Sequence, residues 1–207
     1  MSDLNAIPEF PATDWQVVAA ALVERGYAVV EAALPHECWT ALRSEAQDLL
    51  AEQAFSHGRI GHGGDTHENE IRGDSLCWLD PGMRAGGPYL HWMNALRLSL
   101  NRSLFLGLSE FEAHYAHFPA GGFYRTHLDR YGDSNSRVLS SVFYCNQDWP
   151  ADAGGEFVMY DADDRVCLTL APAGGTLVLF LSAGTRHEAR PSTRPRWSVA
   201  GWFRTRI

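Results

Sequence analysis

Two histidines and one aspartate have the side-chain types and the spacing needed to bind a metal ion. One residue separates His127 from Asp129, and His187 lies much further along the chain. Because residues i and i+2 of a strand project from the same face, His127 and Asp129 can contact one ion together. Two imidazoles and one carboxylate can occupy one face of an octahedral ferrous ion, which leaves positions for a bidentate organic acid and dioxygen. The three residues therefore predict the ligand set of a non-haem iron oxygenase.

An arginine shortly after His187 has the chemistry to anchor the organic acid. Arg196 begins the alternating segment 196–203, in which Arg196, Ser198 and Ala200 share one face. A guanidinium that points into a barrel needs an anion, and its planar fork fits a carboxylate in a bidentate fashion. We therefore expect Arg196 to bind the far carboxylate of 2-oxoglutarate.

The flanking sequence predicts how these residues are presented. Residues 123–128 are rich in strand formers and residues 130–136 in turn formers, so the H-x-D pair should lie where a strand runs into a loop. The apolar run 176–181 predicts a strand, and a turn and a second strand would then return His187 to the site. Each motif alone could be fortuitous, since H-x-D also occurs in surface loops and Arg196 could be a surface charge. Their order, spacing and strand context together favour the metal site.

The remaining chain is helical in its first third and patterned as short strands in its second half. The expected elements are helices at 14–25 with Thr13 as cap and Gly26 as stop, at about 36–55 and at 89–104, and a strand at 27–30. Short strands separated by Gly, Pro, Asp and Asn follow to the C-terminus. Helices followed by seven or eight short strands predict a mostly β, α+β fold, namely a double-stranded β-helix (jelly roll) with flanking N-terminal helices.

The chain of 207 residues suits one catalytic domain over residues 1–207. We expect residues 1–105 to provide helical support together with a mobile lid loop, and residues 106–207 to form the β-helix core. Glycines and charged residues concentrate in residues 56–87, a composition that favours mobility over packing. Closure of such a lid would exclude water from an oxidising site.

Charge and cysteine content limit the partners and the compartment. The 25 acidic residues outnumber the 17 basic ones without any Lys/Arg block, which argues against nucleic acid and hence against a nucleic-acid dealkylase. The four cysteines lack C-x-x-C spacing, and Cys145 and Cys167 lie in apolar strands, so we expect free buried thiols. Residues 1–11 lack the features of a signal peptide, and no apolar run is long enough to span a membrane. We therefore expect a cytoplasmic protein without membrane contact.

From about residue 71 to residue 203 the chain resembles the 2-oxoglutarate and iron(II)-dependent oxygenases, in particular the prolyl 4-hydroxylases related to the animal oxygen-sensing prolyl hydroxylases. The matching features are the H-x-D…H…R set, Tyr144 in the strand 138–146, Asp148-Trp149, the turn at 154–157, and the upstream Ile71-Arg72-Gly73-Asp74 with Trp78. Few unrelated chains would carry all of these in order.

The resemblance implies roles for individual residues. It implies that the triad binds iron, that Arg196 and Tyr144 hold the C5 carboxylate of 2-oxoglutarate, and that Trp202 forms a wall of the pocket. The implied substrate contacts are Arg72, Asp74, Trp78, Tyr124 and Arg137. In the oxygen-sensing relatives residues 71–78 belong to a mobile loop that closes over the substrate, and Arg137 matches a basic residue that tethers it. Asp74 and Arg137 are thus a candidate ion pair.

The chain departs from the family pattern before the H-x-D motif. A tyrosine of the relatives, an iron-side hydrogen bonder, falls at Phe118, for which Tyr115 or His117 could substitute. Tyr144 also has a structural interpretation, because an aromatic residue in an apolar strand is by default a core residue. Most further histidines are expected to be solvated or to lie behind the metal ligands.

The implied reaction couples decarboxylation of 2-oxoglutarate, which yields succinate and CO2, to hydroxylation of a prolyl residue. It requires Fe(II), 2-oxoglutarate and O2, with ascorbate as a supporting reductant. The implied partner is a protein with an exposed prolyl segment, and the link of bacterial relatives to the translation factor EF-Tu makes EF-Tu the candidate. Asp129, in place of a small residue, argues against halogenation, because a halide would need its coordination position.

Three alternatives stay open. An oxygenase of the same fold could act on a free amino acid or another small molecule, for which a short lid would suffice. A zinc hydrolase could use the same triad with a positioned general base, but Arg196 would then have no role. A non-enzymatic binding protein would have no need for intact ligands.

Overall fold

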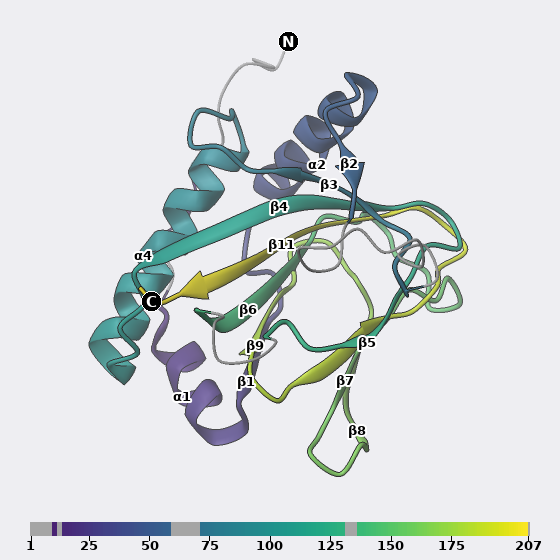
Figure 1. Ribbon diagram of the computed structural model, residues 1–207. Coiled ribbons are helices and arrows are strands. Elements are labelled where there is room, and N and C mark those ends of the chain that lie inside the picture. Colours follow the sequence, from purple (N-terminus) through teal and green to yellow (C-terminus); the bar gives the residue numbers. More distant parts are fainter. Residues whose placement is uncertain (1–9, 12–13, 59–70, 131–135, 207) are drawn as a thin grey trace.

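The computed structural model describes residues 10–11, 14–58, 71–130 and 136–206 (Figure 1). The helices in these residues are α1 (Gln16–Arg25), α2 (His36–Ala51) and α4 (Gly86–Leu104). The strands are β1 (Tyr27–Val30), β2 (Ser56–His57), β3 (Ser75–Trp78), β4 (Glu110–Phe118), β5 (Tyr124–His127), β6 (Arg137–Tyr144), β7 (Phe157–Tyr160), β8 (Val166–Leu170), β9 (Leu177–Leu181), β10 (Arg186–Ala189) and β11 (Arg196–Arg204).

The strands form two antiparallel sheets that face each other. The major sheet has seven strands in the order β1-β9-β6-β11-β4-β3-β2, and the minor sheet has four in the order β5-β10-β7-β8. Within the described residues eight strands follow α4, and apart from the β7–β8 hairpin of the minor sheet consecutive strands lie in opposite sheets. Distant segments are thereby brought together, as in the pairing of β11 with both β4 and β6. This arrangement confirms the jelly-roll prediction.

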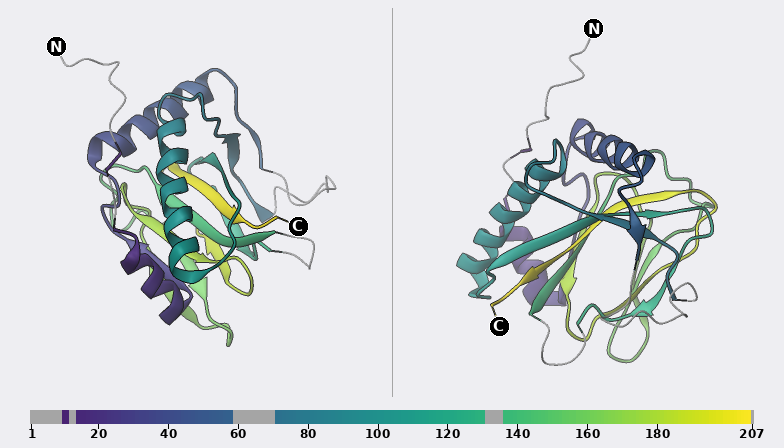
Figure 2. Two further views of the ribbon diagram at one scale, coloured as in Figure 1. Left: turned by 90° about the vertical axis from the view of Figure 1, so that its left-hand side faces the viewer. Right: turned by 45° about the horizontal axis from the view of Figure 1, so that its top comes forward.

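Alternation along β9 shows how one sheet supports two apolar layers. Leu177 and Leu179 pack with the helices in the larger core, whereas Val178 and Phe180 pack against Phe157 of the minor sheet. Full burial of such side chains stabilises the fold by about 1.5–3 kcal/mol each. Figure 2 shows α1 and α4 covering one face of the major sheet, which leaves the space between the sheets for the site.

The helix boundaries differ from the predicted ones where local contacts override periodicity. Gly26 ends α1 as predicted, with φ of 77°. The helix begins at Gln16, two residues later than predicted, because the Asp14 carboxylate accepts a hydrogen bond from the Gln16 amide at 3.0 Å. The predicted cap, Thr13, lies outside the described residues. No helix among the described residues has the length and apolar character needed to cross a membrane.

Helix α2 also ends earlier than predicted, at Ala51 instead of about Phe55. Gln53 adopts a left-handed conformation with φ of 61°, and the Ala54 amide donates to the Leu49 carbonyl at 2.9 Å. This pattern is typical of a Schellman C-terminus, in which a left-handed residue stops the helix.

The predicted lid segment, residues 56–87, contains more packed structure than its composition indicated. Strand β2 pairs with β3, and β3 pairs with β4, so both extend the edge of the major sheet. The first two residues of α4, Gly86 and Gly87, lie in the same segment. The expectation of poor packing is therefore wrong for these parts, and residues 59–70 of the expected lid lie outside the described residues.

Three of the four cysteines are buried free thiols, as expected, namely Cys38, Cys77 and Cys145. The prediction is wrong for Cys167, which is exposed. The reason is its position in β8, the last strand of the minor sheet, where an apolar pattern does not imply burial on both faces.

Candidate metal centre

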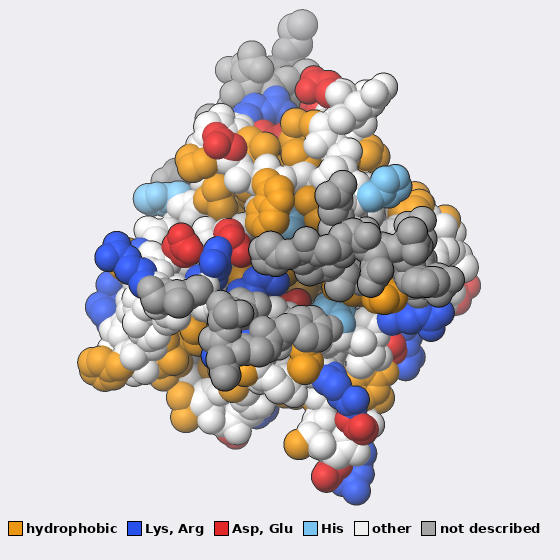
Figure 3. All heavy atoms as spheres, in the orientation of Figure 1, with side chains coloured by type: hydrophobic (Ala, Val, Ile, Leu, Met, Phe, Trp, Pro, Cys, Tyr) orange, Lys and Arg blue, Asp and Glu red, His pale blue; other side chains and the backbone are white. Residues whose placement is uncertain are grey.

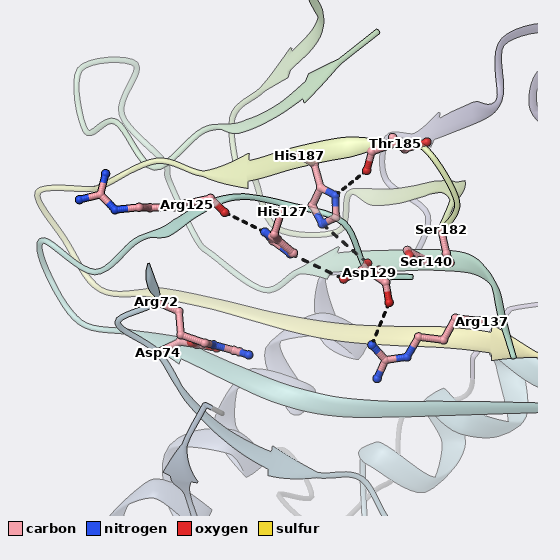
Figure 4. A network of polar contacts seen from close by, with 10 residues as sticks. All are labelled: Arg72, Asp74, Arg125, His127, Asp129, Arg137, Ser140, Ser182, Thr185 and His187. Atoms are coloured by element: carbon pink, nitrogen blue, oxygen red, sulfur yellow. Dashed lines mark hydrogen bonds and ion pairs between the residues drawn. The ribbon is translucent and has the colours of Figure 1, made fainter. Parts of the chain in front are cut away.

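The two predicted histidine ligands are cross-strand neighbours. Strand β10 pairs with β5 so that His187 lies opposite His127, and their ring centroids are 4.2 Å apart. Strand β5 ends at His127, and Asp129 follows in the loop. The Asp129 carboxylate oxygens lie 3.6 Å from His127 Nε2 and 3.7 Å from His187 Nε2. Within the described part of the chain, these three residues are the group whose ligand atoms, all within 4.8 Å of one another, could hold a metal ion (Figure 4).

Backbone carbonyls orient both imidazoles toward the same point. His127 Nδ1 lies 2.8 Å from the Arg125 carbonyl oxygen, and His187 Nδ1 lies 3.1 Å from that of Thr185. A carbonyl can only accept, so each Nδ1 carries the proton and each Nε2 keeps its lone pair. Hydrogen bonds of this kind fix the tautomer and the direction of metal-binding histidines.

The surroundings keep His187 and Asp129 in the protonation states that metal binding requires. Burial lowers the pKa of His187 to about 4, so its imidazole is neutral. Burial by itself would raise the pKa of Asp129, but His187, His127 and the Ser140 hydroxyl hold that pKa well below its usual range. The Ser140 Oγ is in turn 2.9 Å from the Ser182 Oγ, and both serines are buried. A neutral imidazole and an ionised carboxylate are the ligand forms for a divalent ion.

A cavity of about 650 Å³ opens beside the triad and lies between the sheets. Its wall includes the alternate residues Arg196, Ser198, Ala200, Trp202 and Arg204 of β11, so the prediction that this face is shared is confirmed. In the middle of the molecular face in Figure 3, acidic, basic and histidine side chains gather beside hydrophobic ones. These are the chemical types that line the cavity.

Arg196 is a buried cation with one unsatisfied nitrogen. It is 1% exposed, and its Nη1 donates to the carbonyls of Gly155 and Arg190. The Phe118 ring centroid lies 4.2 Å from its guanidinium carbon. Among the described residues its Nη2 has no hydrogen-bond partner. A buried charge is costly without an anionic partner, so the cavity is suited to a carboxylate at this end.

Tyr144 lies on the same wall, where it can share such a carboxylate. Its position in β6 is directly opposite Ser198, two residues from Arg196 on the same face of β11. Burial raises the pKa of Tyr144 to about 12, so its hydroxyl remains a hydrogen-bond donor.

The other end of the cavity is aromatic. The guanidinium of Arg137 lies 3.6 Å from the Trp202 ring centroid, and the His114 ring is 5.5 Å from Trp202 and 5.2 Å from Trp78. Sequence reasoning left His114 among the histidines expected to be solvated or to lie behind the metal ligands, whereas it is buried and lines the cavity. His114 lies four residues before Phe118 on β4, and an even separation along a strand puts two side chains on the same face. This spacing is the signal that would have placed His114 on the cavity wall.

Tyr115 and His117 cannot replace the family tyrosine. Strand alternation turns both away from the cavity, which is lined instead by His114, Ala116 and Phe118. The Tyr115 hydroxyl donates to Glu45 at 2.6 Å, and His117 stacks on Trp197 with centroids 4.3 Å apart. The suggested substitutes are therefore wrong.

The residues predicted to contact substrate all line the cavity, namely Arg72, Asp74, Trp78, Tyr124 and Arg137. The predicted pairing of Asp74 with Arg137 is wrong, because Asp74 accepts two hydrogen bonds of 2.6 Å from Arg72. Arg137 instead lies 3.5 Å from Glu112 and donates to the Asp129 carbonyl at 3.4 Å.

Comparisons with known proteins agree with this geometry. A family model described as the 2OG-Fe(II) oxygenase superfamily matches residues 113–204. A prolyl 4-hydroxylase from Pseudomonas putida is 39% identical, with a TM-score of 0.84, and the match covers 92% of this chain and 98% of that one. A Trichoplax adhaerens prolyl hydroxylase, solved with a hypoxia inducible factor peptide, is 23% identical with a TM-score of 0.79 and coverage of 93% and 94%. Among the curated proteins, no sequence matches.

A viral collagen prolyl hydroxylase from Paramecium Bursaria Chlorella virus-1, solved with 2-oxoglutarate, shares the fold at 16% identity, with a TM-score of 0.63 and coverage of 89% and 98%. The similarity to the Pseudomonas enzyme extends over nearly the whole of both chains. The protein therefore belongs to the prolyl 4-hydroxylase family of the Fe(II)- and 2-oxoglutarate-dependent oxygenases, whose reactions use Fe(II), 2-oxoglutarate and O2.

Proposed function

We propose that this protein hydroxylates a prolyl residue of a protein substrate and couples that reaction to the oxidative decarboxylation of 2-oxoglutarate. The family supplies the reaction type. The observation that carries the proposal for this chain is the unsatisfied Nη2 of Arg196, buried in the same cavity as the triad of His127, Asp129 and His187. A metal-binding triad and a buried cation in one cavity suit a metal ion together with a dicarboxylate.

The triad residues would hold the ferrous ion. Both Nε2 lone pairs and the Asp129 carboxylate point to one location, and His187 and Asp129 already have the protonation states that a bound divalent ion requires. When bound, the ferrous ion supplies the oxygen-activating chemistry that C–H hydroxylation needs. The contribution of the protein is to position the reactants and to exclude water.

Arg196 and Tyr144 would bind the C5 carboxylate of 2-oxoglutarate. Arg196 offers its Nη2 and a full positive charge, and Tyr144 offers a protonated hydroxyl. Phe118 covers the guanidinium and keeps water away, which strengthens a charge-assisted hydrogen bond. Trp202 would form part of the wall of the same pocket.

The substrate would enter along the rim formed by Arg72, Asp74, Trp78, Tyr124 and Arg137. Trp78 is 50% exposed at this rim, which is unusual for a tryptophan and suits contact with a peptide. The peptide bound to the Trichoplax enzyme supports a peptide or protein as the substrate class. EF-Tu is our candidate for the protein that carries the target proline.

Turnover with defined substrates tests the proposal. Purified protein with Fe(II), ascorbate and 2-oxoglutarate is mixed with EF-Tu, a proline-containing peptide or free proline, and succinate and substrate mass are measured. We expect succinate to form with EF-Tu or the peptide, which gains the mass of one oxygen atom on a proline. His127→Ala should abolish both signals. Stimulation by free proline alone would favour a small-molecule oxygenase and overturn the assignment of a protein substrate.

A further inference from the structure

A stack of side chains ends on one of the proposed iron ligands. The Tyr124 and His127 rings are nearly parallel, with an interplanar angle of 11° and centroids 3.6 Å apart. The Arg72 guanidinium carbon lies over the Tyr124 ring, 4.4 Å from its centroid. Because the imidazole occupies one face of the phenol ring, the guanidinium covers the other. The order of the stack is therefore Arg72, Tyr124, His127.

The outer end of the stack is held firmly. Asp74 accepts two hydrogen bonds of 2.6 Å from Arg72, and the Asp74 side chain is 1% exposed. The Gly73 amide donates to the Phe123 carbonyl at 2.8 Å, which ties this segment to the start of β5. Gly58 leaves the space that the guanidinium needs, since a side chain there would collide with it. Arg72 is thus fixed from several directions.

The two histidine ligands are supported in different ways. His187 packs against the core aromatics Phe180 and Phe157, with centroids 4.6 and 5.5 Å away. His127 has one backbone hydrogen bond through Nδ1, to the carbonyl of Arg125, and the Tyr124 ring on its face. One hydrogen bond sets the tautomer but does not by itself fix the plane of the ring. The parallel phenol ring of Tyr124 and the neighbouring His187 ring, whose centroid is 4.2 Å away, restrict rotation of that plane.

We infer that Tyr124 and Arg72 are positioning residues for His127, in addition to any contact they make with substrate. The stack orients the His127 imidazole for metal binding before 2-oxoglutarate or substrate is present. This inference rests on the proposed iron site. Residues behind a metal ligand typically change metal affinity by about 10–100-fold when they are removed. Linkage is reciprocal, so a bound metal ion also stabilises Arg72 and Asp74 in their observed positions.

Titration of metal-free, full-length protein with Mn²⁺ alone tests the inference without turnover. Tyr124→Leu should weaken Mn²⁺ binding about tenfold, whereas Tyr124→Phe keeps the ring and should bind as the unaltered protein does. Arg72→Gln and Gly58→Ala should each weaken binding, because the first removes the guanidinium from the stack and the second displaces it. Thr126→Val is the matched control on β5, since Thr126 faces away and bonds Glu188. It should leave the affinity unchanged.

Two further measurements separate positioning from a loss of fold. The circular dichroism and the melting temperature of each metal-free variant show whether it is folded. The visible spectrum of the Co²⁺-loaded protein reports ligand geometry and should change in Tyr124→Leu but not in Tyr124→Phe.

The outcomes distinguish this inference from the function on which it rests. If Tyr124→Leu is folded and binds Mn²⁺ as tightly as the unaltered protein while its KM for peptide rises, Tyr124 is a substrate contact and the inference is wrong. The proposed iron site is wrong if the unaltered protein does not bind Mn²⁺, or if the Asp129→Ala variant binds Mn²⁺ as tightly as the unaltered protein. In either case the inference about Tyr124 and Arg72 is wrong as well.

Discussion

At the scale of single residues, the site depends on polar groups that the fold buries without satisfying them completely. Arg196 is the clearest case, because burial of a cation is tolerated only when a partner anion or hydrogen-bond acceptors compensate. Two carbonyls satisfy Nη1, and Nη2 is left without a partner among the described residues. His114 on the cavity wall is also buried, and its burial keeps the imidazole neutral.

Replacing Arg196 should weaken 2-oxoglutarate binding without unfolding the protein. In Arg196→Met the charge-assisted hydrogen bonds are lost, which at about 2–3 kcal/mol corresponds to a roughly 30–150-fold higher dissociation constant. Calorimetry with 2-oxoglutarate and Mn²⁺ measures this change. Arg194→Gln, at a partly exposed arginine nearby that does not line the cavity, should bind normally. Equal affinity in Arg196→Met and the unaltered protein would exclude Arg196 as the carboxylate anchor.

Burial of His114 should make stability depend on pH. Burial lowers its pKa to about 4 in the folded state, whereas its pKa in the unfolded chain is about 6.5. Between these values only the unfolded state takes up the proton, so stability is greatest above pH 6.5 and decreases as pH falls toward 4. The loss is on the order of 3 kcal/mol. Urea unfolding of His114→Gln should show a shallower decrease over this range than the unaltered protein, and parallel curves would contradict the prediction.

At the scale of secondary-structure elements, one buried carboxylate joins three elements behind the site. Glu45 of α2 accepts the amides of Ala85 and Gly86 at 2.9 and 2.8 Å, and the Tyr115 hydroxyl of β4 at 2.6 Å. A carboxylate at a helix N-terminus satisfies free amides and interacts favourably with the helix dipole. This contact explains why α4 begins at Gly86 rather than at Tyr89.

Glu45→Gln should lower the stability of the fold while leaving the metal site unchanged. The amide loses the negative charge and part of the accepting capacity, at a cost of about 1–3 kcal/mol. Tyr115 faces away from the cavity, so Mn²⁺ affinity should be retained. Urea unfolding measures the first effect and Mn²⁺ titration the second. Glu52→Gln, at an exposed position after the same helix, should change neither the stability nor the Mn²⁺ affinity. If Glu45→Gln is as stable as the unaltered protein, this account is wrong.

At the scale of the whole molecule, the cavity lies between the two sheets, and the proposed ion would be held on its minor-sheet side. The ligands come from β10 and from the end of β5, and the remainder of the cavity wall comes from the major sheet. Metal binding occurs only in the folded arrangement, because His187 and His127 are distant in sequence. Binding free energy is therefore added to folding free energy.

Metal removal should consequently destabilise the protein. Saturation with Mn²⁺ at 100 times the dissociation constant adds about 2.7 kcal/mol of stability by mass action. Differential scanning calorimetry should show a lower melting temperature after chelation and recovery after Mn²⁺ is restored. Asp129→Ala should melt at the same temperature with and without Mn²⁺. A shift of equal size in Asp129→Ala would mean that the stabilising ion binds elsewhere.

The sequence was sufficient wherever function follows from local periodicity and residue chemistry. The i, i+2 spacing of His127 and Asp129, the shared face of β11 that begins at Arg196, and the end of α1 at Gly26 are all set within a few residues. The expectation that Tyr144 and Trp202 line the cavity came from the resemblance to the prolyl 4-hydroxylases. These features were recovered because backbone alternation and turn preferences act at short range.

The tertiary structure alone decided the remaining features, because these depend on which distant segments pack together. The register of β10 on β5 places His187 opposite His127, and Glu45 moves the start of α4. The guanidinium of Arg72 reaches both Asp74 and the Tyr124 ring, so the expected pairing of Asp74 with Arg137 did not form. Several side chains that are distant in sequence can bind the same partner, and the pairing that forms is the one that gives the folded protein the lowest free energy. Local sequence patterns define the chemical groups of this site, and long-range packing determines how they are oriented.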